Sequence, residues 1–366
     1  QCHMPDAARY HRLQLVLAVA GLAGTVIYLA AALATGAAHA LALTAARVTD
    51  IAWLRVAIVA LVLAAAHGAL TFPFAWTRGW WLPRRYGLLH QPLAAWLGDR
   101  AKAALLTGAL GLAAVEIIYA LLRSTPHWWL AAAAAFFAAH VAIAFVLPVW
   151  IVPLFYRLTP LDDEQLRQRL LALASRVGVP AVGVWVADQS RKSRTANAAV
   201  VGWGGTRRIL LFDTLLTQFP SEEIESVLAH ELGHHVHGDM RRGLAVRGAL
   251  SVLTFWVADL LLRAGVSRLG LAGAADPAGV PWLVLVLLGL GLVTLPLGNG
   301  FSRRIERQAD DFALATTGNP AAFIGAMERL GDLNLAERRP NRLKELVLYS
   351  HPALDRRIAR ARGESA

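Results

Sequence analysis

Four histidines and two acidic residues lie close together in the segment LAHELGHHVHGD, which runs from Leu228 to Asp239. Within it, His230, Glu231 and His234 form the pattern H-E-x-x-H. On a helix, residues i and i+4 share one face, so two imidazoles can reach one metal ion. The glutamate beside them can take a proton from a water that the ion activates. The spacing predicts a zinc site with a general base; the alternative is a polar helix start with solvated histidines.

A zinc ion needs a third protein ligand, and His237 competes for this position. It lies on roughly the same helix face as His230, but it is displaced along a straight helix by about 10 Å. Zinc–nitrogen bonds of about 2 Å cannot span that gap. We therefore expect His237, and even more so His235, to be interfacial polar residues.

A better source of the third ligand is the segment FSRRIERQADDFA, which begins at Phe301. It places Glu306 and Asp310 at positions i and i+4 of a second helix. One carboxylate could bind the ion while the other orients a ligating imidazole, a common arrangement around zinc. The spacing alone leaves open a solvated helix face on which Arg303 and Arg307 pair with these acids.

The segment PSEEIESVLAHELGHH predicts the helix that carries the motif. Ser221 is a suitable N-cap, and the two glutamates after it match the positive end of the helix dipole. The helix would then begin nine residues before His230. We expect it to continue through Arg241 and Arg242 into an apolar span.

The surrounding segment predicts a small mixed domain. Asp162 to Val177 has the pattern of an amphipathic helix, and Val182 to Ala187 is a strand candidate. The run ANAAVVGWGGTRRILLFD predicts a hairpin with a tight turn at Gly204-Gly205. Two later helices are expected, at Ser302 to Thr317 and at Pro320 to Leu330.

The composition indicates a membrane protein, because 56% of the 366 residues are hydrophobic and crossing a bilayer as a helix takes about 20 apolar residues. Six runs are long enough: Leu13 to Thr35, Ile51 to Phe74, Ala103 to Leu122, Trp128 to Val152, Leu244 to Leu262 and Val280 to Gly300. Cys2 is the only cysteine, so a metal must be held by histidines and carboxylates. The net charge of +11 suggests contacts with anionic lipid and not with nucleic acid.

The distribution of Lys and Arg predicts the orientation in the membrane. The more basic loops place both termini and the segment Pro153 to Gly243 in the cytoplasm. The chain then divides into four parts: a membrane domain of four spans (1–152), a cytoplasmic catalytic segment (153–243), two further spans (244–300) and carboxy-terminal cytoplasmic helices (301–366). Ionisable residues also lie within the runs, where such groups normally face protein or water; they include Arg55, Glu116, His140, Arg247 and Asp259. Of these, Arg55 and Asp259 could simply lie near span ends.

Four segments together resemble the type I CAAX prenyl endopeptidases and their bacterial relatives: LAHELGHH, SRRIERQADDFA, TANAAVVGWGGTRRILLFDTLL and YSHPALDRRI. The likeness extends from about Phe72 to Ile358. These enzymes are membrane zinc metalloproteases. The resemblance therefore implies a mainly α, multi-span helical membrane protein that encloses a chamber and carries a small cytoplasmic α+β zinc metalloprotease domain of the gluzincin type.

The resemblance also implies roles for individual residues. They are His230, His234 and Glu306 as zinc ligands, Glu231 as general base, Asp310 as the acid behind a ligand, Asn197 as a grip on the substrate backbone, and His351 and Arg357 as stabilisers of the oxyanion. Without the family, Asn197 reads as a turn residue and the last two as a helix start with surface charge. The sequence departs from the family at Asp239, where many members have a further histidine.

The expected function is that of an integral membrane endopeptidase with one Zn²⁺ per chain. It would act on membrane-associated or unfolded proteins, or on CAAX-type peptides, with its site facing the cytoplasm of a bacterium. The partners expected are a peptide or protein substrate and the lipid bilayer, and no nucleic acid. Two alternatives stay open: a protease dedicated to maturing a secreted or modified peptide precursor, and a non-proteolytic membrane metal carrier or receptor, which would not need Glu231 as a base.

Overall fold

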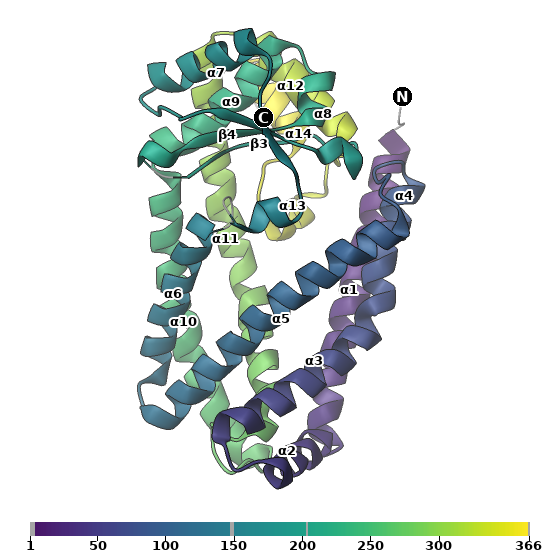
Figure 1. The fold of residues 1–366 in the computed structure, drawn as a ribbon, viewed down its shortest axis with the longest axis vertical. Helices are drawn as coiled ribbons and strands as arrows, with labels where there is room; N and C mark the ends of the chain where they lie inside the picture. The colour runs from purple at the N-terminus through teal and green to yellow at the C-terminus, as the bar shows by residue number, and fades with distance from the viewer. Residues whose placement is uncertain (1–3, 147–149, 203, 365–366) are drawn as a thin grey trace.

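The computed structural model describes residues 4–146, 150–202 and 204–364. A small unit of strands and short helices lies at one end, and long helices extend away from it (Figure 1). Among the described residues, five helices are long and apolar enough to cross a membrane. They are α1 (Met4–Ala34), α3 (Ala52–Trp76), α5 (Leu93–Ser124), α10 (Asp239–Arg268) and α11 (Val280–Thr317).

The fourth apolar run forms α6 (Trp128–Val146). Within the described residues its apolar part, Trp128–Ala144, is shorter than the other five helices, so the sixth span that the sequence predicts stays a prediction. Residues 147–149, in the same predicted span, lie outside the described residues. Helix α6 packs along α10 (Figure 1), and the short helix α2 (Ala37–Val48) joins α1 to α3 at the far end.

The last apolar run and the helix expected after it are one continuous element. Helix α11 extends over 38 residues, roughly 57 Å at the rise of an α-helix. The break expected near Gly300 is absent because this glycine keeps helical backbone angles, and the helix ends only at Gly318, with φ 61°. The predicted boundary at residue 300 therefore falls inside a helix, and Glu306 is rigidly connected to the span.

The opposite holds for the helix of the H-E-x-x-H motif, which the sequence predicts to continue into the next span. Helix α9 (Ser221–Val236) stops, Gly238 adopts φ 66°, and α10 begins at Asp239. Glycine tolerates this left-handed conformation without a steric penalty. At the other end, Pro220 and not Ser221 occupies the N-cap position.

The strands form a four-stranded sheet in the order β1-β2-β4-β3. Strands β1 (Leu158–Pro160) and β2 (Val184–Ala187) are antiparallel, β2 and β4 (Arg208–Phe212) are parallel, and β3 (Ala198–Val201) pairs antiparallel with β4. The hairpin is confirmed, but its turn is the longer loop 202–207, so the tight turn was wrong. Strand β3 is one of the two edge strands, and Trp203 lies outside the described residues.

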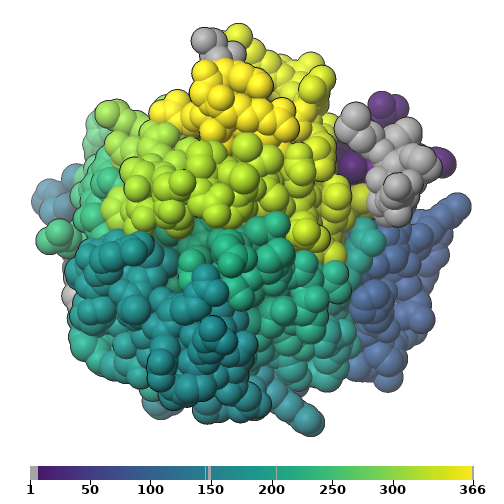
Figure 2. All heavy atoms as spheres, turned by 90° about the horizontal axis from the view of Figure 1, so that it is seen from above, coloured from purple at the N-terminus to yellow at the C-terminus, as the bar shows by residue number. Residues whose placement is uncertain are grey.

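One face of this sheet is covered by helices that share its hydrophobic core. Helix α7 (Glu164–Arg176) begins where the Asp163 carboxylate accepts a hydrogen bond from the Leu166 amide, as expected for the amphipathic helix predicted there. Helices α9 and α12 (Pro320–Leu333) complete the core. Seen from above, the segments of this unit, coloured teal, green and yellow, lie side by side (Figure 2).

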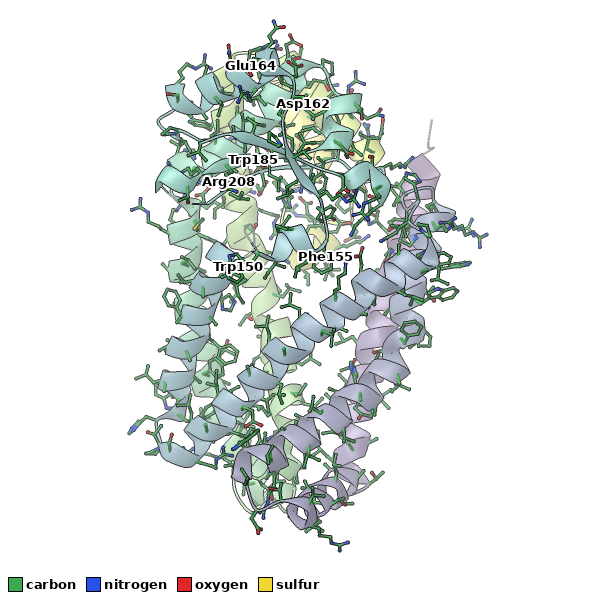
Figure 3. The ribbon with its side chains drawn as sticks, viewed as in Figure 1. Trp150, Phe155, Asp162, Glu164, Trp185 and Arg208 are labelled. Carbon is green, nitrogen blue, oxygen red and sulfur yellow. The ribbon has the colours of Figure 1, made fainter. Side chains whose placement is uncertain are left out.

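Aromatic side chains lie where the small unit meets the long helices. Trp150 and Phe155 are on the side of the sheet that faces those helices, whereas Asp162 and Glu164 are on the far side (Figure 3). Trp150 is 73% exposed, and aromatic residues are enriched at membrane–water interfaces.

Candidate metal centre and active site

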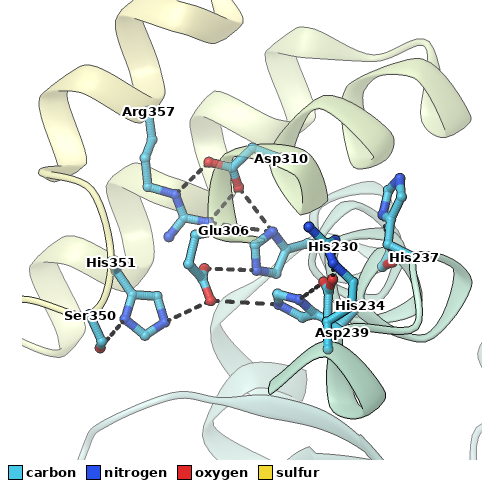
Figure 4. A network of polar contacts seen from close by, with 11 residues as sticks. His230, His234, His237, Asp239, Glu306, Asp310, Ser350, His351 and Arg357 are labelled. Atoms are coloured by element: carbon cyan, nitrogen blue, oxygen red, sulfur yellow. Dashed lines mark hydrogen bonds and ion pairs between the residues drawn. The ribbon is translucent and has the colours of Figure 1, made fainter. Parts of the chain in front are cut away.

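Three side chains from two helices converge on one point. His230 and His234 lie on α9 and Glu306 lies on α11, and one potential ligand atom from each falls within 4.8 Å of the others. The His230 Nε2 is 3.3 Å from one Glu306 oxygen, and the His234 Nε2 is 3.6 Å from the other (Figure 4). The i and i+4 spacing on α9 therefore produces the shared face that the motif predicts.

The two helices can approach this closely because Gly233 lies between the two motif histidines. A Cβ atom at this position would be 3.2 Å from the Ala309 Cα and 3.2 Å from a ring carbon of Phe312. A larger residue would push α9 away from α11, and Glu306 would then move away from the histidines. The missing side chain at Gly233 therefore allows α9 and α11 to approach closely enough for Glu306 to meet the two histidines.

The residues present fit a divalent metal ion. Glu306 is 6% exposed, and its Oε2 accepts no hydrogen bond within the described part of the chain. Arg303 does not pair with it, because this guanidinium donates to the backbone oxygens of Glu345 and Tyr349. The solvated-face alternative is therefore wrong. Two imidazole nitrogens and a buried carboxylate oxygen form a donor set that suits zinc.

His230 is held from behind by an acid and an arginine. Its Nδ1 is 2.9 Å from the Asp310 Oδ1, and Arg357 donates to both oxygens of Asp310 at 2.6 and 2.9 Å. Burial lowers the pKa of His230, but the neighbouring carboxylates of Asp310 and Glu306 outweigh it and raise the pKa to about 9. With Nδ1 engaged in this way, the Nε2 is directed at the point of convergence.

His234 has a matching partner, which sequence reasoning missed. Its Nδ1 lies 3.0 Å from the Oδ2 of the buried Asp239, and Arg242 donates to the other oxygen of Asp239 at 2.9 Å. Helical spacing does not predict this contact, because Asp239 is five residues from His234 and would not share its face on a straight helix. The backbone turn at Gly238 brings the Asp239 carboxylate back to His234.

We expect Asp239→Asn to weaken metal binding about 10- to 100-fold, the usual effect of losing a carboxylate behind a ligating histidine. The amide can donate to His234 Nδ1, which would favour the tautomer with its proton on the metal-facing nitrogen. Metal affinity measured by competition with a chromogenic chelator checks this. Asp311→Asn is the matched control, since Asp311 is exposed and pairs with Arg360. Equal affinities for the parent and Asp239→Asn would contradict the role.

Glu231 lies beside the ligands and lines a cleft of about 360 Å³. Desolvation by the surrounding protein raises the pKa of its carboxyl group. A raised pKa brings a carboxylate closer to the range in which general acid–base catalysis is efficient. The structure therefore places the residue predicted as general base at the wall of a cavity large enough for part of a peptide.

The same cleft collects the other residues expected to act on a substrate. Asn197, at the start of the edge strand, and His351 line it together with Arg357. The His351 Nε2 is 3.4 Å from Glu306 Oε1, and its Nδ1 is 2.9 Å from the Ser350 hydroxyl (Figure 4). Arg357 stands on α14 (Leu354–Ala361). Residues separated by more than 150 positions therefore surround one space.

The two remaining histidines of the motif segment lie outside the ligand set, as predicted. The His237 Nδ1 contacts the backbone oxygen of Gly233 at 2.8 Å, and its ring packs edge-on against Phe312. The His235 Nε2 is 3.0 Å from the backbone oxygen of Val200 in β3. His235 therefore ties the motif helix to the edge strand.

The sequence profile of peptidase family M48 matches residues 160–365, the part that holds the converging ligands. The chain belongs to peptidase family M48. A second profile, described as CAAX prenyl protease N-terminal, five membrane helices, matches residues 4–157 of this M48 chain. The resemblance is thereby confirmed, and the chain is a multi-pass membrane metalloendopeptidase. Membership in a peptidase family also favours the protease over the alternative of a non-proteolytic membrane metal carrier or receptor.

Individual relatives of the M48 chain agree with this assignment. A Bacillus subtilis metalloprotease, YhfN, is 30% identical over 83% of this chain and 72% of its own length. A CAAX prenyl protease 1 homolog from Arabidopsis thaliana is 30% identical over 80% of this chain and 70% of its own. The crystal structure of S. mikatae Ste24p superposes with a TM-score of 0.78, covering 86% of this chain and 77% of that one at 24% identity. This last likeness shows the fold.

Proposed function

We propose that the chain is a zinc endopeptidase that cleaves extended segments of membrane-associated or unfolded proteins at the cytoplasmic face of the membrane. The observation that carries the proposal is the convergence of His230, His234 and Glu306 next to Glu231, on the wall of a cleft that begins at an edge strand. The site would hold one ion per chain, with Asp310 and Asp239 orienting the two imidazoles.

In this proposal the chain's own residues carry the proton transfers. A bound zinc ion supplies a Lewis acid for the scissile carbonyl and lowers the pKa of water. Glu231 takes a proton from the attacking water and later delivers it to the leaving amine. The imidazole of His351 reaches the site from the opposite side (Figure 4), where an N–H donor can stabilise the oxyanion. Arg357 would help to orient His230 through its hydrogen bonds to Asp310, and it would place a positive charge in the cleft.

The substrate would bind as an added strand beside β3. Because the Asn197 oxygen accepts from the Phe212 amide, the antiparallel alternation turns the peptide groups of Ala198 and Val200 to the outer edge. The Val200 carbonyl is already bound by His235. The Ala198 amide already donates to the Asn197 Oδ1 at 2.9 Å. Pairing would therefore centre on the Ala198 carbonyl and the Val200 amide, and the Asn197 side-chain amide can donate to the substrate backbone.

The depth of the site follows from the two helices that carry the ligands. The His234 and Glu306 side chains meet next to Gly238, where α10 begins its course through the membrane part. The centre would then lie near the membrane surface, where the charged intermediate has access to water and avoids a dry bilayer core. A strand-binding site also requires a substrate backbone that is not already paired within a helix.

We expect cleavage in flexible juxtamembrane segments and not within intact transmembrane helices. Two model substrates with one span each, carrying a flexible tail on the cytoplasmic or on the opposite side, would be incubated with the enzyme in oriented vesicles. Mass spectrometry should find cuts only in the cytoplasmic tail. Zinc removal by a chelator should abolish the cuts, and added zinc should restore them. Cuts near the middle of the span, or in the opposite tail, would contradict the proposal.

A further inference from the structure

The side chain of Asn334 binds the backbone just before the edge strand β3. Its Oδ1 accepts a hydrogen bond from the Ala196 amide at 3.0 Å, and its Nδ2 donates to the Ala196 carbonyl at 3.2 Å. The two residues are 138 positions apart in the chain, and both line the cleft beside the metal centre. The side-chain amide therefore pairs with Ala196 as a neighbouring strand would, through one donor and one acceptor.

This contact limits the part of β3 that a substrate can use. Because the Asn197 carbonyl is bonded to β4, alternate residues from 196 to 200 turn their peptide groups to the outer edge. Asn334 already occupies this edge at Ala196, and His235 occupies the Val200 carbonyl at 3.0 Å. A substrate strand can therefore pair only within the short stretch between these two side chains, next to Asn197.

Asn334 is followed by a turn with an unfavourable backbone conformation. Leu335 has φ 51°, and it is the one non-glycine residue with positive φ in the described part of the chain. This region is sterically penalised for any residue with a Cβ atom. Its side chain is 3% exposed and packs with Tyr10 of α1, Leu82 and Leu88. Packing against residues of the membrane part therefore holds the turn in place.

The first membrane helix also holds this turn through a hydrogen bond. The His11 Nε2 on α1 donates to the Leu335 carbonyl at 2.8 Å, although the two residues are 324 positions apart. His11 lines the same cleft, and the beginning of α1 reaches the level of the small unit (Figure 1). A continuous series of contacts thus connects α1, through the turn and Asn334, with the backbone next to Asn197.

We propose that Asn334 is a positioning residue for substrate binding and that His11 couples its position to α1, an inference that rests on the endopeptidase function proposed above. The Asn197 Oδ1 is bound to the Ala198 amide at 2.9 Å, so its Nδ2 is the group left to donate to a substrate. By fixing the preceding residue, Asn334 holds this donor at the wall of the cleft. Loss of the contact should weaken the grip on the substrate backbone and leave the metal ligands on α9 and α11 in place.

Asn334→Ala should raise KM for an extended peptide about 3- to 30-fold, as for the loss of one or two hydrogen bonds. Because a grip on the backbone acts alike on substrate and transition state, kcat should change by less than about 3-fold. The zinc content should stay parental. Asn319→Ala is the matched control, since it removes the cap at the other end of α12, where Asn319 accepts from the Ala322 amide. It should lower the unfolding temperature without raising KM.

A set of substrate peptides, each N-methylated at one backbone amide, separates positioning from a general loss of structure. In the parent, the methyl group that removes the amide paired with the Ala198 carbonyl should raise KM most. In Asn334→Ala this penalty should shrink, because the edge strand no longer holds the substrate in register. A variant that keeps the parental KM and the full penalty, or that loses kcat alike on every peptide, would overturn the positioning role.

Hydrogen exchange measured by mass spectrometry tests the coupling to α1 without turnover. His11→Ala should speed exchange of the amides in residues 195–198 by about 3- to 10-fold, as expected for easier local opening. His11→Gln, which keeps an N–H donor, should restore the parental rate. His39→Ala is the matched control, because it removes an imidazole contact to a backbone carbonyl, that of Gly270, at the far end of the helices.

The double variant His11→Ala/Asn334→Ala completes a cycle with the two single variants. Contacts that act in series should be non-additive, so the double variant should have nearly the KM of Asn334→Ala alone. Parental exchange of residues 195–198 in His11→Ala, or fully additive effects on KM, would overturn the coupling. A parent that cleaves none of the peptides would count against the proposed endopeptidase, whereas the exchange rates still decide whether α1 positions the edge strand.

Discussion

Glu231→Gln is expected to lower kcat by about 10²- to 10⁴-fold, the range typical for removal of a general base, while the metal content stays at the parental level. The side chains have nearly the same shape, but an amide cannot accept the proton of the attacking water. Glu231 is not among the three converging ligands, so metal binding should not change.

This prediction is checked by steady-state cleavage of a fluorogenic peptide together with metal analysis of the same preparation. Glu222→Gln is the matched control, because Glu222 lies on the same helix but is exposed and away from the cleft. A Glu231→Gln variant with near-parental kcat would remove Glu231 from the chemistry.

Glu306→Ala should lose both the metal and the activity. The variant lacks the only carboxylate oxygen in the ligand set of the described residues, and the two imidazoles alone leave the ion without charge compensation. Replacing a residue that hydrogen-bonds to a metal ligand typically lowers metal affinity about 10- to 100-fold. We expect replacement of a ligand itself to lower it further. Metal affinity and zinc per chain, measured after dialysis against a weak chelator, check this result.

His237→Ala is the matched control for Glu306→Ala, because it removes a histidine from the same segment that the structure places outside the ligand set. It should keep the metal. Thermal unfolding of the metal-free proteins would show whether Glu306→Ala is folded. If Glu306→Ala binds zinc as tightly as the parent while His237→Ala loses it, the assignment of the third ligand is wrong.

The sequence by itself determined the chemistry of the centre. The pattern at His230, Glu231 and His234 depends only on helical periodicity, which any α-helix imposes. The pair Glu306 and Asp310 follows from the same local rule. The apolar runs likewise indicated the membrane helices, because bilayer thickness sets their length.

Tertiary structure decided which acid meets which histidine. Spacing left Glu306 and Asp310 open to pairing with nearby arginines, and only the packing of α11 against α9 at Gly233 directs Glu306 to the histidines. Such contacts depend on side-chain volume between elements far apart in the chain. Local periodicity carries no information about them.

The backbone conformation of single glycines could also not be predicted from the sequence. Gly238 breaks the helix that was predicted to continue, whereas Gly300 stays helical where a break was predicted. Glycine tolerates both conformations at little cost, so the surrounding packing selects between them. The turn at Gly238 is what brings Asp239 back to His234. Periodicity thus specified the two motif histidines, and the fold supplied the carboxylates that hold them.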